Sequence, residues 1–220
     1  MTVLLVIAEA PVAGLVKTGL IPPASPAEAA DLAAAGLLDT LAAARATPGV
    51  QPVVALAGDV RAAERGEQVA EALSGCVVIG QRGRGRADCL ANAYADVAVR
   101  YPGEAVVQIG MDTPQVTPPL LAAAASGLDS VDAVLGLALD GGWWALALRD
   151  PRSAGVLRTI PVSRADTGIR IRRALIEAGH RVGSLPRLSD VDTLADVDLV
   201  AEAAPGTRFA EAALLLRARR

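Results

Sequence analysis

The chain alternates short runs of β-branched and aliphatic residues with long segments rich in Ala and Leu. The run 3–8 is continuously apolar, which is typical of a strand that is covered on both faces. The segment 26–46 has the start signals of a helix, because Ser25 can cap it and Glu28 follows three residues after the cap. This rhythm predicts an α/β fold with a mostly parallel sheet and helices on both faces.

The same criteria predict the remaining elements. Further strands are expected at 52–57, 76–79, 105–109, 133–139, 143–148 and 181–185. Further helices are expected at 59–73, 87–100, 118–127, 165–178, 194–203 and 210–219. The sequence Asp140-Gly141-Gly142 is typical of a tight hairpin and predicts an antiparallel strand pair. Because no repeat or linker interrupts the pattern, we expect residues 1–220 to form a single domain.

Composition excludes several classes of protein. With 52% hydrophobic and 20% charged residues, the chain can bury a full core and is not disordered as a whole. A net charge of −3 argues against a general nucleic-acid binder. The one histidine, His180, excludes zinc sites made of several histidines. Cys76 and Cys89 lack C-x-x-C spacing, so we expect a reducing, cytoplasmic location. No apolar run approaches the roughly 18 residues of a membrane span.

Ligands of open α/β sheets bind beyond the carboxyl ends of the strands. The segments that follow the predicted strands are therefore the candidates for chemistry. They are 9–25, 80–86, 110–116 and 189–193.

The first of these segments is unusually long for a connection without regular structure, which is often a sign of function. Gly14 to Thr18 superficially resembles a phosphate-binding P-loop. The match fails because Pro11 and Val16 stand where that motif needs glycine. What remains is a loop shaped by proline and glycine, in which Lys17 is either a phosphate ligand or a solvated surface residue.

The next two segments carry charges of opposite sign. Arg82, Arg84 and Arg86 alternate with glycine, a pattern that suits an anionic ligand and also a solvated surface. Asp112 follows an apolar strand directly, and its oxygens suit Mg²⁺ or Mn²⁺. The competing interpretation is that Asp112 caps a turn before Thr113-Pro114.

The hairpin and the late segment supply further acidic residues. Trp143 and Trp144 follow Asp140 and point to opposite faces of a strand, so one can pack in the core while the other faces the cleft. Asp190 and Asp192 lie on one side if the chain is extended there. They either supply a second carboxylate for the metal at Asp112 or belong to the start of the following helix, which Thr193 can cap.

Four of these segments resemble, in the right order, the motifs of a bacterial family, DUF2064. Residues 8–20 resemble its opening A-K-A-P-x-P-G-x-V-K-T-R-L, and 109–114 resemble its I-G-S-D-x-P segment. Residues 135–144 are similar to its L-G-P-x-x-D-G-G-Y-Y block, and 190–196 to its D-V-D-T-x-x-D ending. Each motif is weak alone, but the four together cover nearly the whole chain.

The resemblance implies a GT-A fold, related to nucleotide-diphospho-sugar transferases and to nucleotidyltransferases. It implies Asp112 and Asp192 as ligands of Mg²⁺ or Mn²⁺, and Asp112 and Asp140 as catalytic residues. The acceptor side would be Gly141, Gly142 and Trp143. The candidate nucleotide contacts are Ala8, Pro11, Gly14, Lys17, Gln81, Arg82 and Arg84.

The chain departs from the family pattern in its first loop. Glu9 stands where the family has lysine, and Leu15 and Gly19 stand where it has arginine. Three functions therefore stay open: glycosyl transfer from a nucleotide sugar, nucleotidyl transfer with release of pyrophosphate, and a degenerate protein that only binds a ligand or partner. The expected partners are a nucleotide or nucleotide sugar, an unidentified acceptor and a second copy of the chain.

Overall fold

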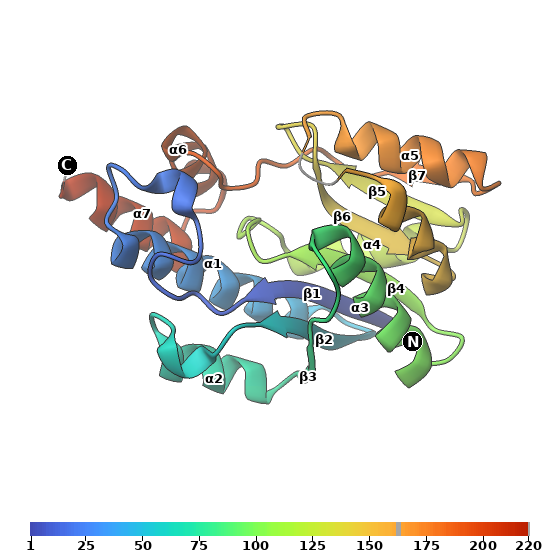
Figure 1. The fold of residues 1–220 in the computed structure, drawn as a ribbon, viewed down its shortest axis with the longest axis horizontal. Helices are drawn as coiled ribbons and strands as arrows, with labels where there is room; N and C mark the ends of the chain where they lie inside the picture. Colours follow the sequence, from blue (N-terminus) through green and yellow to red (C-terminus); the bar gives the residue numbers. More distant parts are fainter. Residues whose placement is uncertain (162–163, 220) are drawn as a thin grey trace.

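The computed structural model describes residues 1–161 and 164–219. Within them lies a sheet of seven strands in the order β3-β2-β1-β4-β6-β5-β7 (Figure 1). The strands are β1 (Thr2–Glu9), β2 (Val50–Ala57), β3 (Val77–Gly80), β4 (Ala105–Gly110), β5 (Ala133–Leu137), β6 (Trp143–Leu148) and β7 (Val182–Ser184).

Most neighbouring strands run parallel, as the sequence predicts. β1 pairs in parallel with β2 and β4, β2 with β3, and β5 with β7. β6 is antiparallel to both of its neighbours, β4 and β5. The antiparallel pair β5–β6 is the hairpin expected around Asp140, Gly141 and Gly142.

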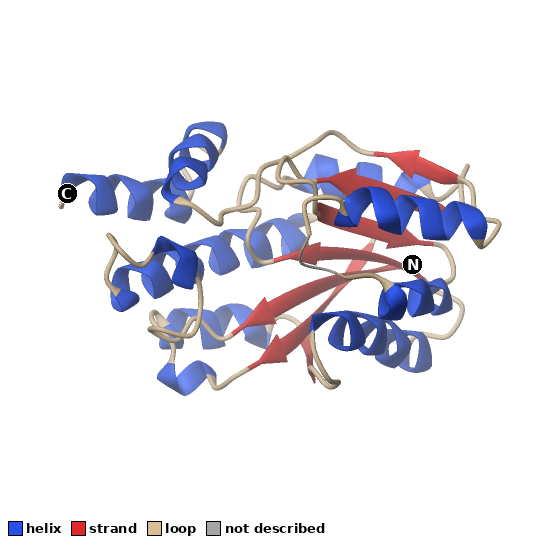
Figure 2. Cartoon of the chain, turned by 45° about the horizontal axis from the view of Figure 1, so that its top comes forward, coloured by secondary structure: helices blue, strands red, loops and turns tan. Residues whose placement is uncertain are grey.

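Helices cover both faces of the sheet (Figure 2). Their bounds, with the short 3-10 segments labelled η, are η1 (Thr18–Leu20), α1 (Pro26–Ala46), η2 (Val60–Ala62), α2 (Gly66–Ser74), α3 (Arg86–Arg100), α4 (Pro118–Gly127), η3 (Pro151–Thr159), α5 (Thr167–Glu177), α6 (Leu194–Ala203) and α7 (Arg208–Ala218). None of these helices, in the described part of the chain, is both long and apolar enough to cross a membrane.

Alternate residues of the strands pack into two separate hydrophobic clusters, one on each face of the sheet. Val54 and its neighbours face α1, α2 and α4, whereas Val53 and its neighbours face α3, η3 and α5. The clusters are built from aliphatic residues, in keeping with an aromatic content of 2%. Tyr94 is an exception in the second cluster, where its buried hydroxyl donates to the carbonyl of Leu146 at 2.6 Å.

A third cluster lies outside the three layers. α6 and α7 pack on the outer side of α1, and Leu20 of the first loop joins them. In Figure 1 this C-terminal part lies beside the blue N-terminal loop. The cluster includes Val191 and Phe209, so the late segment that carries Asp190 and Asp192 is anchored to α1 and α7.

The structure corrects the prediction of one continuous helix at 59–73. Val60–Ala62 forms a short 3-10 turn, and α2 begins only at Gly66. Arg65 adopts a left-handed conformation with φ 51°, which interrupts a helix. η3 was not expected from the sequence at all.

Candidate functional site

The segments that the sequence singled out lie at one edge of the sheet. β1, β2, β3, β4, β5 and β7 all end at this edge, and β6 begins there, as the strand pairings require. The chain that follows β1, β3, β4 and β7 therefore meets the hairpin between β5 and β6.

Close contacts to the backbone bring three of the segments together. The amide of Val191 donates to the carbonyl of Asp112 at 3.2 Å, and Gln115 Nε2 donates to the carbonyl of Ser189. A Cβ on Gly19 would lie 2.8 Å from the carbonyl oxygen of Asp192. The first loop thus packs directly on the late segment, which in turn is bonded to the segment after β4.

Lys17 occupies the centre of this junction. Its Nζ lies 3.3 Å from Asp112 Oδ2 and 3.6 Å from Asp192 Oδ1, and it donates to the carbonyl of Val191. The side chain of Lys17 is 14% exposed, that of Asp112 22% and that of Asp192 63%. The two carboxylates that the sequence predicts as metal ligands therefore lie on either side of one ammonium group.

A cluster of carboxylates lies next to this ion pair. One oxygen of each of Asp140, Asp190 and Asp192 lies within 4.8 Å of the others. The sequence placed Asp190 and Asp192 on one side of the chain but assigned only Asp192 to the metal. It assigned Asp140 to the acceptor side, whereas the structure brings it to the same cluster as Asp192. The turn holds Asp140 in place, because the amide of Gly142 donates to its Oδ1 at 2.7 Å.

The electrostatics of the cluster separate two of its carboxyls. Burial and the neighbouring charges of Asp140, Asp112 and Asp192 raise the pKa of Asp190 to about 6. Burial also pushes the pKa of Asp112 upward, but attraction to Lys17 and Arg86 outweighs it and the pKa lies below its ordinary value. Crowded carboxylate oxygens of this kind suit a hard divalent cation, so the donor set fits Mg²⁺ or Mn²⁺.

An apolar floor explains why Asp112 is partly desolvated. A cavity of about 10 Å³ lies beside Lys17 and Asp112. Its other lining residues are Leu32, Ala33, Gly36, Met111, Pro114, Val191 and Phe209. The charged pair therefore rests on side chains of α1, α7 and the adjoining loops.

Several predicted nucleotide contacts have structural partners. The carbonyls of Ala8 and Ala55 accept from Gln81 Nε2 at 2.8 and 3.0 Å, so Gln81 bridges two strand ends. The carbonyl of Pro11 accepts from the amide of Glu64 at 2.9 Å. Gly14 is exposed and has φ 77°, a turn conformation that favours glycine.

The three arginines after β3 differ in their surroundings. Arg82 NH2 lies 2.6 Å from Asp96 Oδ1, so its guanidinium is already paired with a carboxylate. Arg84 and Arg86 are exposed and pair with no carboxylate among residues 1–161 and 164–219. Sequence reasoning included Arg82 and Arg84 among the predicted nucleotide contacts and left Arg86 out. Arg86 nevertheless contributes to the electrostatics of the site, because its positive charge helps to lower the pKa of Asp112.

The acceptor-side residues lie in a tightly packed hairpin. Gly141 has φ 93°, and a Cβ there would overlap the carbonyl oxygen of Ala165. The carbonyl of Gly141 accepts from the amide of Gly168 at 2.9 Å, which joins the hairpin to α5. Trp144 is buried, while Trp143 is half-buried and its Nε1 donates to Gln108 Oε1 at 3.0 Å. Trp144 is thus the core residue of the pair.

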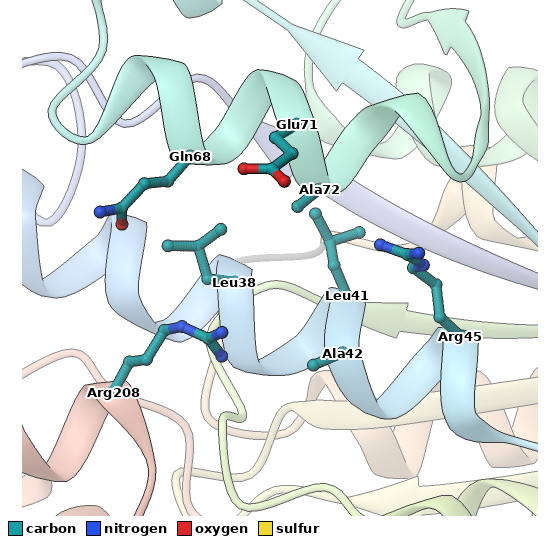
Figure 3. A pocket seen from close by; sticks show the side chains of 8 residues that line it. All are labelled: Leu38, Leu41, Ala42, Arg45, Gln68, Glu71, Ala72 and Arg208. Atoms are coloured by element: carbon teal, nitrogen blue, oxygen red, sulfur yellow. The ribbon is translucent and has the colours of Figure 1, made fainter.

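A separate groove of about 360 Å³ lies between α1 and α2 (Figure 3). Leu38 and Leu41 lie between Arg208 and Arg45. Because its lining residues come from α1, α2 and α7, the groove is a seam between packed helices and not part of the strand-edge site. The full lining is Leu38, Leu41, Ala42, Arg45, Gln68, Glu71, Ala72 and Arg208.

Comparison with known proteins identifies the family. Residues 40–164 match the profile of DUF2064, described as an uncharacterized protein conserved in bacteria. The chain belongs to the DUF2064 family. No curated protein matches this DUF2064 chain significantly in sequence.

Solved structures confirm the fold of this DUF2064 chain. A protein of Desulfovibrio desulfuricans G20, provisionally named a nucleotide-diphospho-sugar transferase, has a TM-score of 0.84 at 24% identity, over 100% of this chain and 96% of its own. A CMP:2-keto-3-deoxy-manno-octonic acid synthetase complexed with CTP has a TM-score of 0.56 at 14% identity, over 91% and 97%. Rv0371c of Mycobacterium tuberculosis H37Rv, complexed with manganese, has a TM-score of 0.53 at 21% identity, over 92% and 99%.

Proposed function

We propose that this DUF2064 chain is a divalent-metal-dependent transferase that uses a nucleotide-activated sugar as its donor. The observation that carries the proposal is the cluster of Asp140, Asp190 and Asp192, whose oxygens lie within 4.8 Å of one another. The cluster lies at the strand edge where α/β sheets bind their ligands, next to Asp112. The fold shared with the named transferase and with the manganese complex supports the proposal.

The donor would bind between the first loop and the loop after β3. When bound, Mg²⁺ or Mn²⁺ would neutralise the charge that develops on the diphosphate leaving group. Arg84 and Arg86 are exposed cations at the start of α3 and would contact phosphate oxygens. The backbone around Ala8, Pro11 and Gly14 would shape the nucleotide side, together with Gln81. Arg82 contributes only if its pair with Asp96 opens.

The acceptor would approach from the hairpin between β5 and β6. Asp140 is exposed there and would orient or deprotonate the attacking group. Gly141, Gly142 and the half-buried Trp143 form the adjoining surface. Asp112 would ligate the metal together with Asp192, from the opposite side of the position that Lys17 Nζ occupies. The predicted homodimer, the acceptor and the cytoplasmic location stay predictions.

A second candidate is nucleotidyl transfer, in which a nucleoside triphosphate is joined to an acceptor and pyrophosphate leaves. The shared fold with a synthetase that was complexed with CTP favours this alternative. Two exposed arginines after β3 would suit the longer triphosphate as well as a diphosphate. Both candidates require the same carboxylates, and they differ in the leaving group that is released.

The test measures binding before turnover. We expect nucleotide sugars or nucleoside triphosphates to raise the melting temperature of the protein only when Mn²⁺ is present. Asp192→Asn should weaken Mn²⁺ binding by about tenfold, or about 1.4 kcal/mol, as measured by calorimetry. Asp192 is largely exposed, so the variant should keep the stability of the parent protein.

Asp198→Asn is the matched control, because Asp198 pairs with Arg217 on the neighbouring helices and lies outside the carboxylate cluster. It should bind Mn²⁺ like the parent protein. Release of a nucleoside diphosphate would identify glycosyl transfer, and release of pyrophosphate would identify nucleotidyl transfer. If no nucleotide stabilises the protein in the presence of Mn²⁺ or Mg²⁺, the chain is the degenerate binding protein instead.

A further inference from the structure

Lys17 makes contacts within the protein that a lysine needed only for phosphate binding would not require. Its ammonium lies 3.3 Å from Asp112 Oδ2 and 3.6 Å from Asp192 Oδ1, and it donates to the carbonyl of Val191. Only 14% of the side chain is exposed. Its donors are therefore directed at protein oxygens, at a place where a cation shared by the two carboxylates would lie.

The backbone of the first loop is arranged to bring Lys17 there. Lys17 is in the left-handed region with φ 48° and ψ 38°, a conformation that is unfavourable for a residue other than glycine. Strain of this kind persists where surrounding contacts hold it. At Gly19 a Cβ would lie 2.8 Å from the carbonyl oxygen of Asp192. Glycine at this position allows the loop to lie flat on the late segment.

The choice of residue type is an independent observation. Lys17 is the one lysine in the chain, against twenty arginines. Arginine would grip a carboxylate with a planar, bidentate fork, as Arg65 does with Asp31 at 2.6 and 2.7 Å. Lysine offers a compact ammonium on a flexible stem, which leaves a carboxylate more readily. Among the ion pairs of residues 1–161 and 164–219, the cation that contacts the proposed metal ligands Asp112 and Asp192 is this lysine.

We propose that Lys17 is an exchangeable counter-ion of the metal site. In the absence of metal its ammonium holds Asp112 and Asp192 together and offsets part of their mutual repulsion. A divalent cation competes for the same oxygens and repels the ammonium, so metal binding releases Lys17. The released side chain then contacts the phosphates of the nucleotide donor, which makes donor binding depend on prior metal binding. This inference rests on the proposed metal-dependent function.

The variants separate exchange from a fixed structural role. Lys17→Met removes the competing cation and should tighten Mn²⁺ binding about fivefold, while weakening nucleotide binding in the presence of Mn²⁺. Lys17→Arg keeps the charge but replaces the ammonium with a fork, and should weaken Mn²⁺ binding. A fixed structural lysine gives the opposite order: rescue by arginine and loss of affinity with methionine. That order would overturn the proposal.

A second measurement uses the parent protein and does not depend on how well a variant folds. Because Lys17 is the one lysine, amine-specific labelling followed by mass spectrometry reports on it directly, and the α-amine of Met1, paired with Glu104 at 2.9 Å, serves as internal reference. Mn²⁺ alone should speed labelling of Lys17 relative to Met1, and Mn²⁺ with a nucleoside diphosphate should slow it again. An unchanged rate in a protein that binds Mn²⁺ refutes the exchange alone, whereas absence of Mn²⁺ binding refutes the proposed function.

Discussion

Asp190 is the residue whose chemistry depends most on its neighbours. It is half-buried, and Asp140, Asp112 and Asp192 surround it, so its pKa rises to about 6. Asp112 lies in the same site, yet its pKa is lowered because Lys17 and Arg86 outweigh the effect of burial. The pKa values of two aspartates in one site are thus shifted in opposite directions. The difference arises because Lys17 and Arg86 act on Asp112.

The raised pKa predicts how stability changes with pH in metal-free buffer. The folded protein binds the Asp190 proton more tightly than the unfolded chain, so this contribution is present below pH 4 and is lost as the pH rises through about 6. Asp190→Asn should therefore be more stable than the parent at pH 7, on the order of 1–2 kcal/mol after allowance for solvent screening, with little difference at pH 4. Urea unfolding at both pH values measures this.

Asp198→Asn serves as the control here too, since it lies outside the cluster. A difference between Asp190→Asn and the parent that is the same at pH 4 and pH 7 would contradict the assigned pKa. The lowered pKa of Asp112 acts below pH 4 and does not enter this window.

Among the elements, the helices whose caps are local were predictable from the sequence. α1, α4 and α6 begin and end at the expected residues, and Ser25, Thr117 and Thr193 each accept a hydrogen bond at the helix start. α2 was mispredicted because its start depends on distant residues. Arg65 bonds to Asp31 of α1, and a Cβ at Gly66 would lie 2.7 Å from the carbonyl oxygen of Val60.

The cap of α1 allows a direct test at this scale. Ser25 Oγ accepts from the amide of Glu28 at 3.2 Å, and the amide of Ser25 donates to Glu28 Oε2 at 2.9 Å. Ser25→Ala should lower the free energy of unfolding by about 1 kcal/mol, because buried α1 is then left with an unsatisfied first turn. Denaturant unfolding measures the loss. Ser126→Ala, near the end of α4, should change little, and equal effects of the two substitutions would argue against capping.

The site was predictable in part for the same reason. The sequence predicts carboxylates directly after two strands, with Asp112 after β4 and Asp190 and Asp192 after β7. Parallel strands place such ends at one edge of the sheet. The sequence contains no local signal that Asp140 joins Asp192 or that Lys17 bridges Asp112 and Asp192. Those contacts depend on how the first loop folds back over the late segment, which is a tertiary event.

For the molecule as a whole, the C-terminal helices are part of the site although they carry none of its charges. α6 and α7 form their own hydrophobic cluster with α1 and the first loop, and Val191 in that cluster lies between Asp190 and Asp192 in sequence. Asp39 of α1 fixes the start of α7, because its Oδ2 accepts from the amide of Phe209 at 2.8 Å. Phe209 also lines the cavity beside Lys17 and Asp112.

Phe209→Ala should therefore affect both stability and the site. Loss of a buried phenyl ring costs about 3–5 kcal/mol, and we expect weaker Mn²⁺ binding because the floor beneath Asp112 loosens. Urea unfolding and Mn²⁺ calorimetry, at a temperature where the variant is still folded, measure the two effects. Leu214→Ala is the matched control on α7, because Leu214 is 61% exposed. Full Mn²⁺ affinity in a folded Phe209→Ala protein would show that the C-terminal helices do not support metal binding at the site.

The two tryptophans at the start of β6 give the protein an intrinsic fluorescent probe. They are the only tryptophans in the chain, and they directly follow the turn that holds Asp140. One indole is enclosed and the other is partly open to solvent, so their emission combines a shielded signal with one that senses the hairpin. Ligand titrations can thus be followed by intrinsic tryptophan fluorescence, without attaching a dye to the protein.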